Sequence, residues 1–271
     1  MPQSGPPLCT QDIGTGVPLL LIHGGLSDGP GSWAAQTRSL ATQHRLLIPD
    51  RRGAGRSPIE PRPYTIRGDA VDMLDLMDRA GVRQAHIAGF SYGGLVAIEM
   101  SCQAPDRLLS LHLIEPPYLS LLPADPSVAA LTASGAAVFR HAGEQDPEDT
   151  ARDFFRMLVG ERGVERMVAS PSWSAIVAEA TRVRDEQEPS TYPPDRLHHL
   201  TLGVPVRVYS GGRSHPGLQQ IARRLSALLP GSELIVFPDA PHAVQFVGDG
   251  FDTELLRVTG GDGGRCGVPL L

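Results

Sequence analysis

A serine set among glycines is the first candidate for chemistry in this sequence of 271 residues. Ser91 lies in the stretch AGFSYGG, where an apolar run typical of a buried strand gives way to a helical pattern. A strand that turns sharply into a helix needs small neighbours, and Gly89, Gly93 and Gly94 supply them. Such a corner exposes a hydroxyl beside a helix N-terminus, whose N–H groups favour negative charge. We therefore predict that Ser91 is a nucleophile; the alternative is a glycine turn with an incidental serine.

The elements that would position this serine alternate between strand-like and helix-like segments. This alternation indicates parallel βαβ units and an α/β fold. The strand-like runs, some of which continue into the following loop, cover residues 17–25, 44–53, 84–90, 108–117, 204–212 and 232–242. The helical patterns lie near 32–42, 65–82, 94–104 and 215–230.

One long segment carries no strand pattern. Between Pro117 and about Ser190 the sequence predicts helices, as in DPEDTARDFFRMLVG, which has an Asp N-cap and a proline at the first helical position. We expect residues 118–190 to form a helical lid inserted into a core made of residues 1–117 and 191–271. Such a lid would cover the carboxyl edge of the sheet, where open α/β sheets bind ligands. The glycine-rich end, about 259–271, is expected to be a flexible tail.

Four motifs in order make the sequence resemble the α/β-hydrolase fold family, specifically its lidded, serine-nucleophile members. They are HGG (23–25), DRRGAGRS (50–57), GFSYGG (89–94) and DAPH (239–242), and the resemblance covers roughly residues 8 to 258. It implies a mostly parallel central sheet flanked by helices, with a helical lid insertion. DRRGAGRS is expected to shape and tie a turn, and His23 to brace the loop that follows the first long strand.

The resemblance also implies the base and the acid that would activate the serine. The family places a histidine after the last strand, and His242 is there. The usual position of the acid holds Ser214, which cannot stabilise an imidazolium. Some resembling hydrolases carry the acid one strand earlier, which makes Glu115 our preferred acid, with Asp239 as the fallback. The alternative for Glu115 is a bond to nearby backbone or to an arginine of the lid.

The remaining site residues concern the oxyanion and the substrate. A tetrahedral intermediate needs two backbone N–H donors, which we assign to Tyr92, the residue after the nucleophile, and by resemblance to Gly25, with Leu26 as the alternative. The apolar residues of the lid favour a small, mostly hydrophobic substrate, although the same side chains could simply pack the lid on the core. The substrate-binding candidates are Leu26, Trp33, Phe139 and Phe155.

The leading hypothesis is acyl transfer to water. It describes a carboxylesterase-like or thioesterase-like hydrolase that cleaves an ester or thioester of a small, largely hydrophobic molecule through a Ser91 acyl-enzyme, without a cofactor. Because Ser214 stands where the family usually has its acid, a second hypothesis is a non-hydrolytic enzyme of the same fold. It would be a cyclase, a lyase or a cofactor-free oxygen or peroxide enzyme in secondary metabolism. A catalytically inert ligand-binding member is the third hypothesis.

Composition excludes several other classes of protein. The net charge is −6, and no basic run or aromatic-interleaved basic stripe favours nucleic acid. Cys9, Cys102 and Cys266 share no metal-type spacing and fit free thiols in a reducing compartment. The start has no signal-peptide pattern, and the apolar run VPLLLI is too short to span a membrane. We expect a cytoplasmic protein with a small-molecule substrate, no metal and no membrane or nucleic-acid partner; a homodimer stays open.

Overall fold

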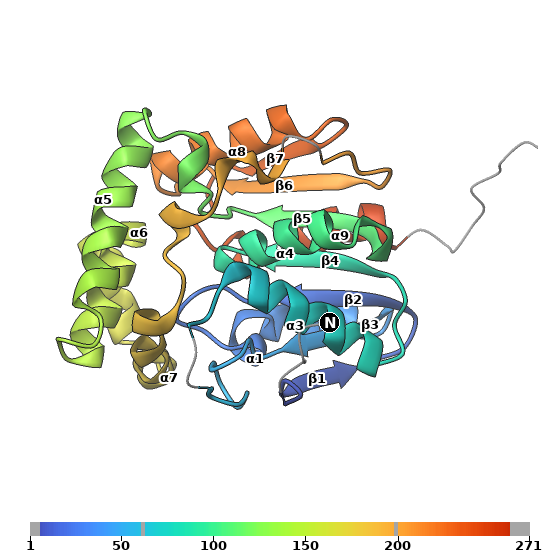
Figure 1. Ribbon diagram of the computed structural model, residues 1–271, viewed down its shortest axis with the longest axis horizontal. Coiled ribbons are helices and arrows are strands. Elements are labelled where there is room, and N and C mark those ends of the chain that lie inside the picture. The colour runs from blue at the N-terminus through green and yellow to red at the C-terminus, as the bar shows by residue number, and fades with distance from the viewer. Residues whose placement is uncertain (1–5, 61–62, 198–199, 261–271) are drawn as a thin grey trace, which may run out of the picture.

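The computed structural model describes residues 6–60, 63–197 and 200–260. Within them, seven strands form one sheet in the order β1-β3-β2-β4-β5-β6-β7 (Figure 1). The six parallel strands that the sequence predicts are confirmed. They are β2 (Val17–Ile22), β3 (His44–Pro49), β4 (Ala85–Phe90), β5 (Leu108–Ile114), β6 (Val206–Gly211) and β7 (Glu233–Phe237). Sequence reasoning missed β1 (Thr10–Ile13), which pairs antiparallel with β3 at the sheet edge.

The central strands are buried on both faces, which explains their continuous apolar sequence. All six residues of β4 are buried. In β2, Leu20 and Ile22 pack into the hydrophobic cluster on one face of the sheet, while Leu19 and Leu21 pack into the cluster on the other. The alternation of side chains along a strand therefore supplies both cores from one apolar run.

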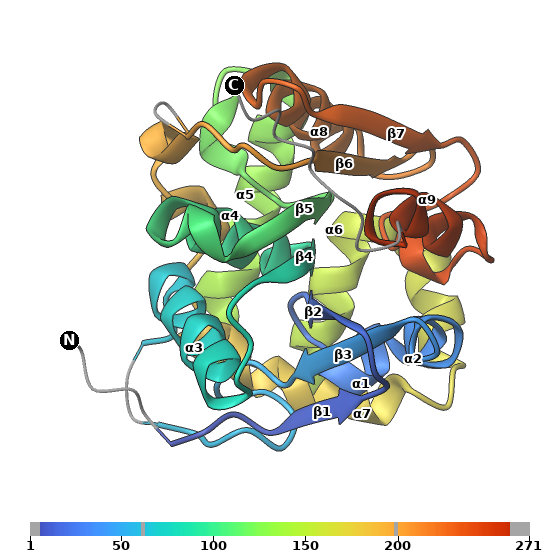
Figure 2. The same cartoon turned by 90° about the vertical axis from the view of Figure 1, so that its right-hand side faces the viewer.

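Helices cover both faces of the sheet (Figure 2). One face carries α3 (Ile66–Arg79), α4 (Tyr92–Gln103) and α8 (Pro216–Leu228). The other carries α1 (Gly29–Ser32), α2 (Ala34–Leu40) and α9 (Gly250–Thr259). The helix predicted near 32–42 is α2, and Trp33, whose backbone angles of φ −122° and ψ 17° are non-helical, separates it from the short helix α1 before it.

The segment between β5 and β6 contains three α-helices, which stand together at one end of the strands (Figure 1). They are α5 (Pro126–His141), α6 (Pro147–Val168) and α7 (Trp173–Glu179). Short 3₁₀ turns, Leu119–Leu121, Ala180–Asp185, Pro189–Thr191 and Pro194–Leu197, connect them to the sheet. Side chains of Asp125 and Asp146 accept hydrogen bonds from the first turns of α5 and α6, as N-caps before proline do.

Two predictions concern parts of the chain that are only partly described. The predicted tail lies outside the described residues from 261 onward, and helix α9 occupies the chain up to Thr259. Cys9 and Cys102 are free thiols, while Cys266 lies outside the described residues.

No described helix has both the length and the apolar character needed to cross a membrane.

Candidate active site

Ser91 lies at a strained corner between β4 and α4. Its backbone angles are φ 51° and ψ −120°, a conformation that residues other than glycine rarely adopt. The Ser91 N–H donates to the carbonyl of Ile114 at 2.8 Å, and the Gly94 N–H donates to the carbonyl of Ser91 at 2.8 Å. Backbone strain of this kind, which costs about 1–3 kcal/mol, concentrates at functional sites because surrounding contacts must maintain it.

The glycines around Ser91 are required by close backbone approach. A Cβ atom on Gly89 would lie 2.3 Å from the carbonyl oxygen of Gly93, where helix α4 crosses the end of β4. A Cβ atom on Gly93 would lie 2.4 Å from the carbonyl oxygen of Ile22 in β2. Small residues therefore let the first turn of α4 lie directly against two strand ends, with the serine at the top of the sheet.

His242 and Glu115 meet although 127 positions separate them. His242 lies in the loop after β7, and its Nδ1 is 2.7 Å from Oε2 of Glu115. Glu115 directly follows β5, is fully buried, and has a positive φ of 42°. Asp239, the fallback acid, is exposed, and the ring nitrogen that it would need is already bonded to Glu115.

Three further donors hold the Glu115 carboxylate. Its Oε1 accepts from the Ser210 hydroxyl and the Gly211 N–H, both at 2.8 Å. Its Oε2 accepts from the Ser214 hydroxyl at 2.6 Å, beside the bond from His242. Ser214, which replaces an acid at the position where the sequence resemblance expects one, thus supports a carboxylate that comes from the neighbouring strand.

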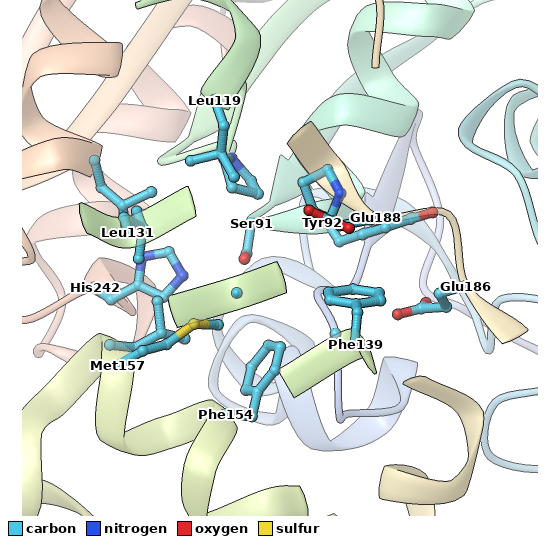
Figure 3. Close-up of a pocket in the computed structure, with 16 residues that line it drawn as sticks. Ser91, Tyr92, Leu119, Leu131, Phe139, Phe154, Met157, Glu186, Glu188 and His242 are labelled. Carbon is cyan, nitrogen blue, oxygen red and sulfur yellow. The ribbon is translucent and has the colours of Figure 1, made fainter. Parts of the chain in front are cut away.

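The second nitrogen of His242 faces the serine. Because Glu115 accepts from Nδ1–H, Nε2 carries a lone pair, and this buried atom has no hydrogen-bond partner among the described residues. Ser91 and His242 line the same pocket, with the hydroxyl and the imidazole both directed into it (Figure 3). The ring is packed against Phe90 at a centroid distance of 5.0 Å, which limits its movement.

The oxyanion donors assigned from the sequence lie at this pocket. Tyr92 is the first residue of α4, so its N–H has no acceptor within the helix. Tyr92 and Gly25 both line the pocket beside Ser91, and a Cβ on Gly25 would lie 3.3 Å from the Phe154 ring. Leu26, the alternative donor, has a strained φ of 47°.

His23 ties the loop that carries Gly25 to strand β3. Its Nδ1 donates to the carbonyl of Gly24 at 2.8 Å, and its Nε2 accepts from the Arg51 N–H at 2.8 Å. Burial, reinforced by the nearby charges of Arg51 and Arg182, lowers the pKa of His23 well below its usual value. A neutral His23 can keep both bonds, so it braces the loop.

A buried ionic cluster beneath this loop was missed by sequence reasoning. Arg51 is fully buried; its guanidinium contacts Asp69 and Glu186, each at 2.8 Å, and the carbonyl of Gly24 at 2.9 Å. Arg182 also pairs with Glu186. Burial opposes the charge of Arg51, but the carboxylates of Glu186 and Asp69 raise its pKa above the usual value. Arg51 belongs to the DRRGAGRS motif, which therefore links the loop that carries Gly24 and Gly25 to the segment after α7.

The pocket lies beneath α5 and α6, and about 580 Å³ of space in and in front of it, open solvent included, is not filled by protein atoms. Leu131, Gly135 and Phe139 follow one another at four-residue intervals along one face of α5. Helix α6 adds Phe154, Met157 and Leu158 (Figure 3). Besides Ser91 and His242, three polar side chains share the lining with these apolar groups, namely Tyr92, Glu186 and Glu188.

Three of the four substrate-binding candidates do not line this pocket. Phe139 does line it. Trp33 is fully buried in the core on the α2–α9 face of the sheet, 6.4 Å from the Phe251 ring. Leu26 and Phe155 pack into the cluster between the loop and helices α5 to α7. Apolar character predicts burial, but the direction of each side chain decides whether it faces a ligand or the core.

Comparisons with known proteins identify the fold family. The α/β hydrolase fold family matches residues 17–249. A protein of Azorhizobium caulinodans, named "Putative carbamate hydrolase RutD", is 39% identical over 101 residues; the match covers 37% of this chain and 38% of that protein. The structure of a thermophilic esterase from Thermogutta terrifontis is 27% identical, with a TM-score of 0.62 over 92% of this chain and 91% of the esterase.

A third comparison bears on the fold alone. The enol-lactonase of Burkholderia xenovorans superposes with a TM-score of 0.74 at 19% identity, covering 93% of this chain and 96% of the lactonase. The family match spans most of the chain and contains the serine corner, the Glu115–His242 pair and the helical segment between β5 and β6. The chain belongs to the α/β-hydrolase fold family.

Proposed function

We propose that this protein is a serine hydrolase that cleaves an ester or thioester of a small, largely hydrophobic molecule through a Ser91 acyl-enzyme. One observation carries the proposal: the unpartnered Nε2 of His242 and the Ser91 hydroxyl line one pocket, while Nδ1 of the same ring is bonded to Glu115. A serine that attacks a carbonyl needs a base of this kind beside it to accept its proton.

The first half of the reaction forms the acyl-enzyme. His242 Nε2 accepts the proton of the Ser91 hydroxyl while the oxygen attacks the substrate carbonyl. Glu115 holds the ring in the tautomer with hydrogen on Nδ1 and stabilises the imidazolium that results. The protonated Nε2 then gives its proton to the leaving alcohol or thiol, and the acyl group remains on Ser91.

The negative charge of the tetrahedral intermediate would develop between the Ser91 corner and the loop that carries Gly25. The backbone N–H of Tyr92, at the start of α4, and that of Gly25 are the proposed donors. Removal of one such donor typically raises the barrier by about 3–4 kcal/mol. Water then repeats the sequence: His242 deprotonates it, it attacks the acyl carbonyl, and Ser91 leaves with the proton restored.

The apolar lining supports an ester with a hydrophobic acyl or alcohol part. Side chains from α5 and α6 remove water from the pocket, which strengthens electrostatic interactions inside it. The chain spans about 38% of the length of the RutD protein that it matches, whereas its match to the Thermogutta esterase extends over nearly the whole of both chains.

The experiment compares p-nitrophenyl butyrate hydrolysis by the protein and by Ser91→Ala. Removal of a nucleophile that acts with its histidine lowers kcat by about 10⁶-fold in a comparable serine enzyme. We expect a loss too large to measure above background. Ser174→Ala, which truncates an exposed serine of α7, is the matched control and retains activity. Ester hydrolysis that survives in Ser91→Ala would refute the Ser91 acyl-enzyme.

A further inference from the structure

The hydroxyl of Tyr92 is a polar atom without a partner in a buried position. The side chain is 3% exposed, lines the pocket beside Ser91, and its hydroxyl makes no hydrogen bond among the described residues. Burial, with the carboxylates of Glu186 and Asp69 adding to it, raises the pKa of Tyr92 well above its usual value. The group is therefore a neutral phenol, which can donate one hydrogen bond and accept another. An orphaned hydroxyl in a ligand pocket calls for a ligand atom.

Glu186 and Glu188 line the same pocket as Tyr92. Glu186 uses only Oε1 for Arg51 and Arg182, and its carboxylate is directed toward Phe139 and the cavity (Figure 3). A Cβ on Gly25 would lie 3.9 Å from Oε2 of Glu186, which places this oxygen next to the oxyanion loop. Glu186 thus offers an acceptor to the pocket.

Glu188 adds a charge that no cation balances. It lines the pocket and accepts a hydrogen bond from the Ser190 hydroxyl, but it forms no ion pair among the described residues. In the buried ionic cluster, Arg51 and Arg182 are balanced by Asp69 and Glu186. With Glu188 the local sum is negative, so this part of the pocket attracts a cation despite the two nearby guanidinium groups.

We propose that the pocket takes a substrate whose apolar acyl chain ends in a primary ammonium group, which Glu188, the Tyr92 hydroxyl and Glu186 receive. The inference rests on the proposed serine hydrolase and names the substrate class for the same site. An ammonium group has three N–H bonds, and each of the three protein groups can accept one of them. The leucine, phenylalanine and methionine side chains of α5 and α6 cover the methylene groups between the carbonyl and the ammonium.

The test uses three p-nitrophenyl esters of nearly equal size: heptanoate, 6-hydroxyhexanoate and 6-aminohexanoate. They differ in the last group, which is a methyl, a hydroxyl or an ammonium. We expect kcat/KM for the amino ester to exceed that for each of the others by at least about tenfold, the effect of a charged hydrogen bond. Glu188→Gln keeps the shape and removes the charge, and should bring the ratio of amino ester to heptanoate close to one.

Two more variants sharpen the test. Tyr92→Phe keeps the backbone N–H of Tyr92 and removes the orphaned hydroxyl, so the same ratio should fall. Glu165→Gln removes an exposed carboxylate of α6 outside the pocket lining and should leave the ratio at the wild-type value.

The outcomes separate this inference from the proposed function. Heptanoate hydrolysis with no preference for the amino ester would overturn the ammonium proposal and leave the serine hydrolase intact. The same holds if the hydroxy ester is preferred, or if the preference persists in Glu188→Gln. If the protein hydrolyses none of the three esters, both proposals fail together.

Discussion

Glu115→Gln perturbs the proposed triad in a way that the structure predicts atom by atom. The carboxylate accepts four hydrogen bonds, from Ser210, Gly211, Ser214 and His242. A glutamine offers one oxygen and one NH₂ group in the same space. The Gly211 N–H can only donate, so the amide oxygen should take the place of Oε1. The NH₂ group then takes the place of Oε2 and faces Ser214 and the Nδ1 atom of His242.

This orientation reverses the tautomer of the histidine. With an NH₂ donor opposite it, Nδ1 must accept, and the ring proton moves to Nε2. An Nε2–H cannot accept the proton of Ser91, so kcat should fall by about 10⁴-fold, as it does when a triad aspartate becomes asparagine. The free energy of unfolding should change by less than about 2 kcal/mol, because the Ser214 hydroxyl can rotate to accept from the new NH₂ group.

The assay measures kcat with p-nitrophenyl butyrate and, in parallel, urea-induced unfolding. A second variant adds Ser214→Asp to Glu115→Gln. The Ser214 hydroxyl is 2.6 Å from Oε2 of Glu115, so a carboxylate at position 214 would lie near Nδ1 and should restore at least about tenfold of the lost kcat. A folded Glu115→Gln variant that loses less than about tenfold would refute the assignment of Glu115 as the acid.

Two predictions concern stability. Gly93→Ala would place a Cβ atom 2.4 Å from the carbonyl oxygen of Ile22, and should lower the free energy of unfolding by at least about 2 kcal/mol. The control Gly203→Ala, whose Cβ atom would meet no atom within 4 Å, should leave that free energy unchanged. Equal effects of the two variants in urea titrations would contradict the close approach at Gly93. Burial lowers the pKa of His86 to about 4 and that of His112 to about 3. Both are neutral when folded but become protonated when unfolded below about pH 6.5, so stability should fall between pH 6.5 and 4, by about 2 kcal/mol for each residue at pH 5. A flat profile of unfolding free energy over this range would contradict their burial as neutral groups.

The sequence predicted those elements whose side chains follow a simple period. The parallel strands are continuous apolar runs because both faces are buried, and the serine corner is visible because close backbone approach leaves only glycine at its neighbours. Strand β1 was missed because its sequence, TQDI, is short and half-exposed at the sheet edge. An edge strand needs no apolar run, so its pattern does not differ from that of a loop.

The sequence predicts those site residues that the order of the strands along the chain makes recognisable. It does not predict contacts between residues that are far apart in the chain and carry no local pattern. Glu115 follows β5 and His242 follows β7, which is the last strand, and the structure brings the two side chains together. Arg51 and Glu186 are 135 positions apart, and no local pattern indicates that a fully buried arginine pairs with a residue beyond helices α5 to α7. Trp33 illustrates the opposite error, since this large aromatic residue, which follows the loop after β2, belongs to the core.

The most direct measurement of the central claim is covalent labelling by a fluorophosphonate, followed by mass spectrometry of the peptides. Such a probe reacts with a serine whose hydroxyl is activated by a histidine base. We predict one adduct, on the peptide that contains Ser91, and a large loss of labelling in His242→Gln but not in His141→Gln, which changes an exposed histidine of α5. An unlabelled Ser91 in the folded protein, or labelling that does not depend on His242, would contradict the account.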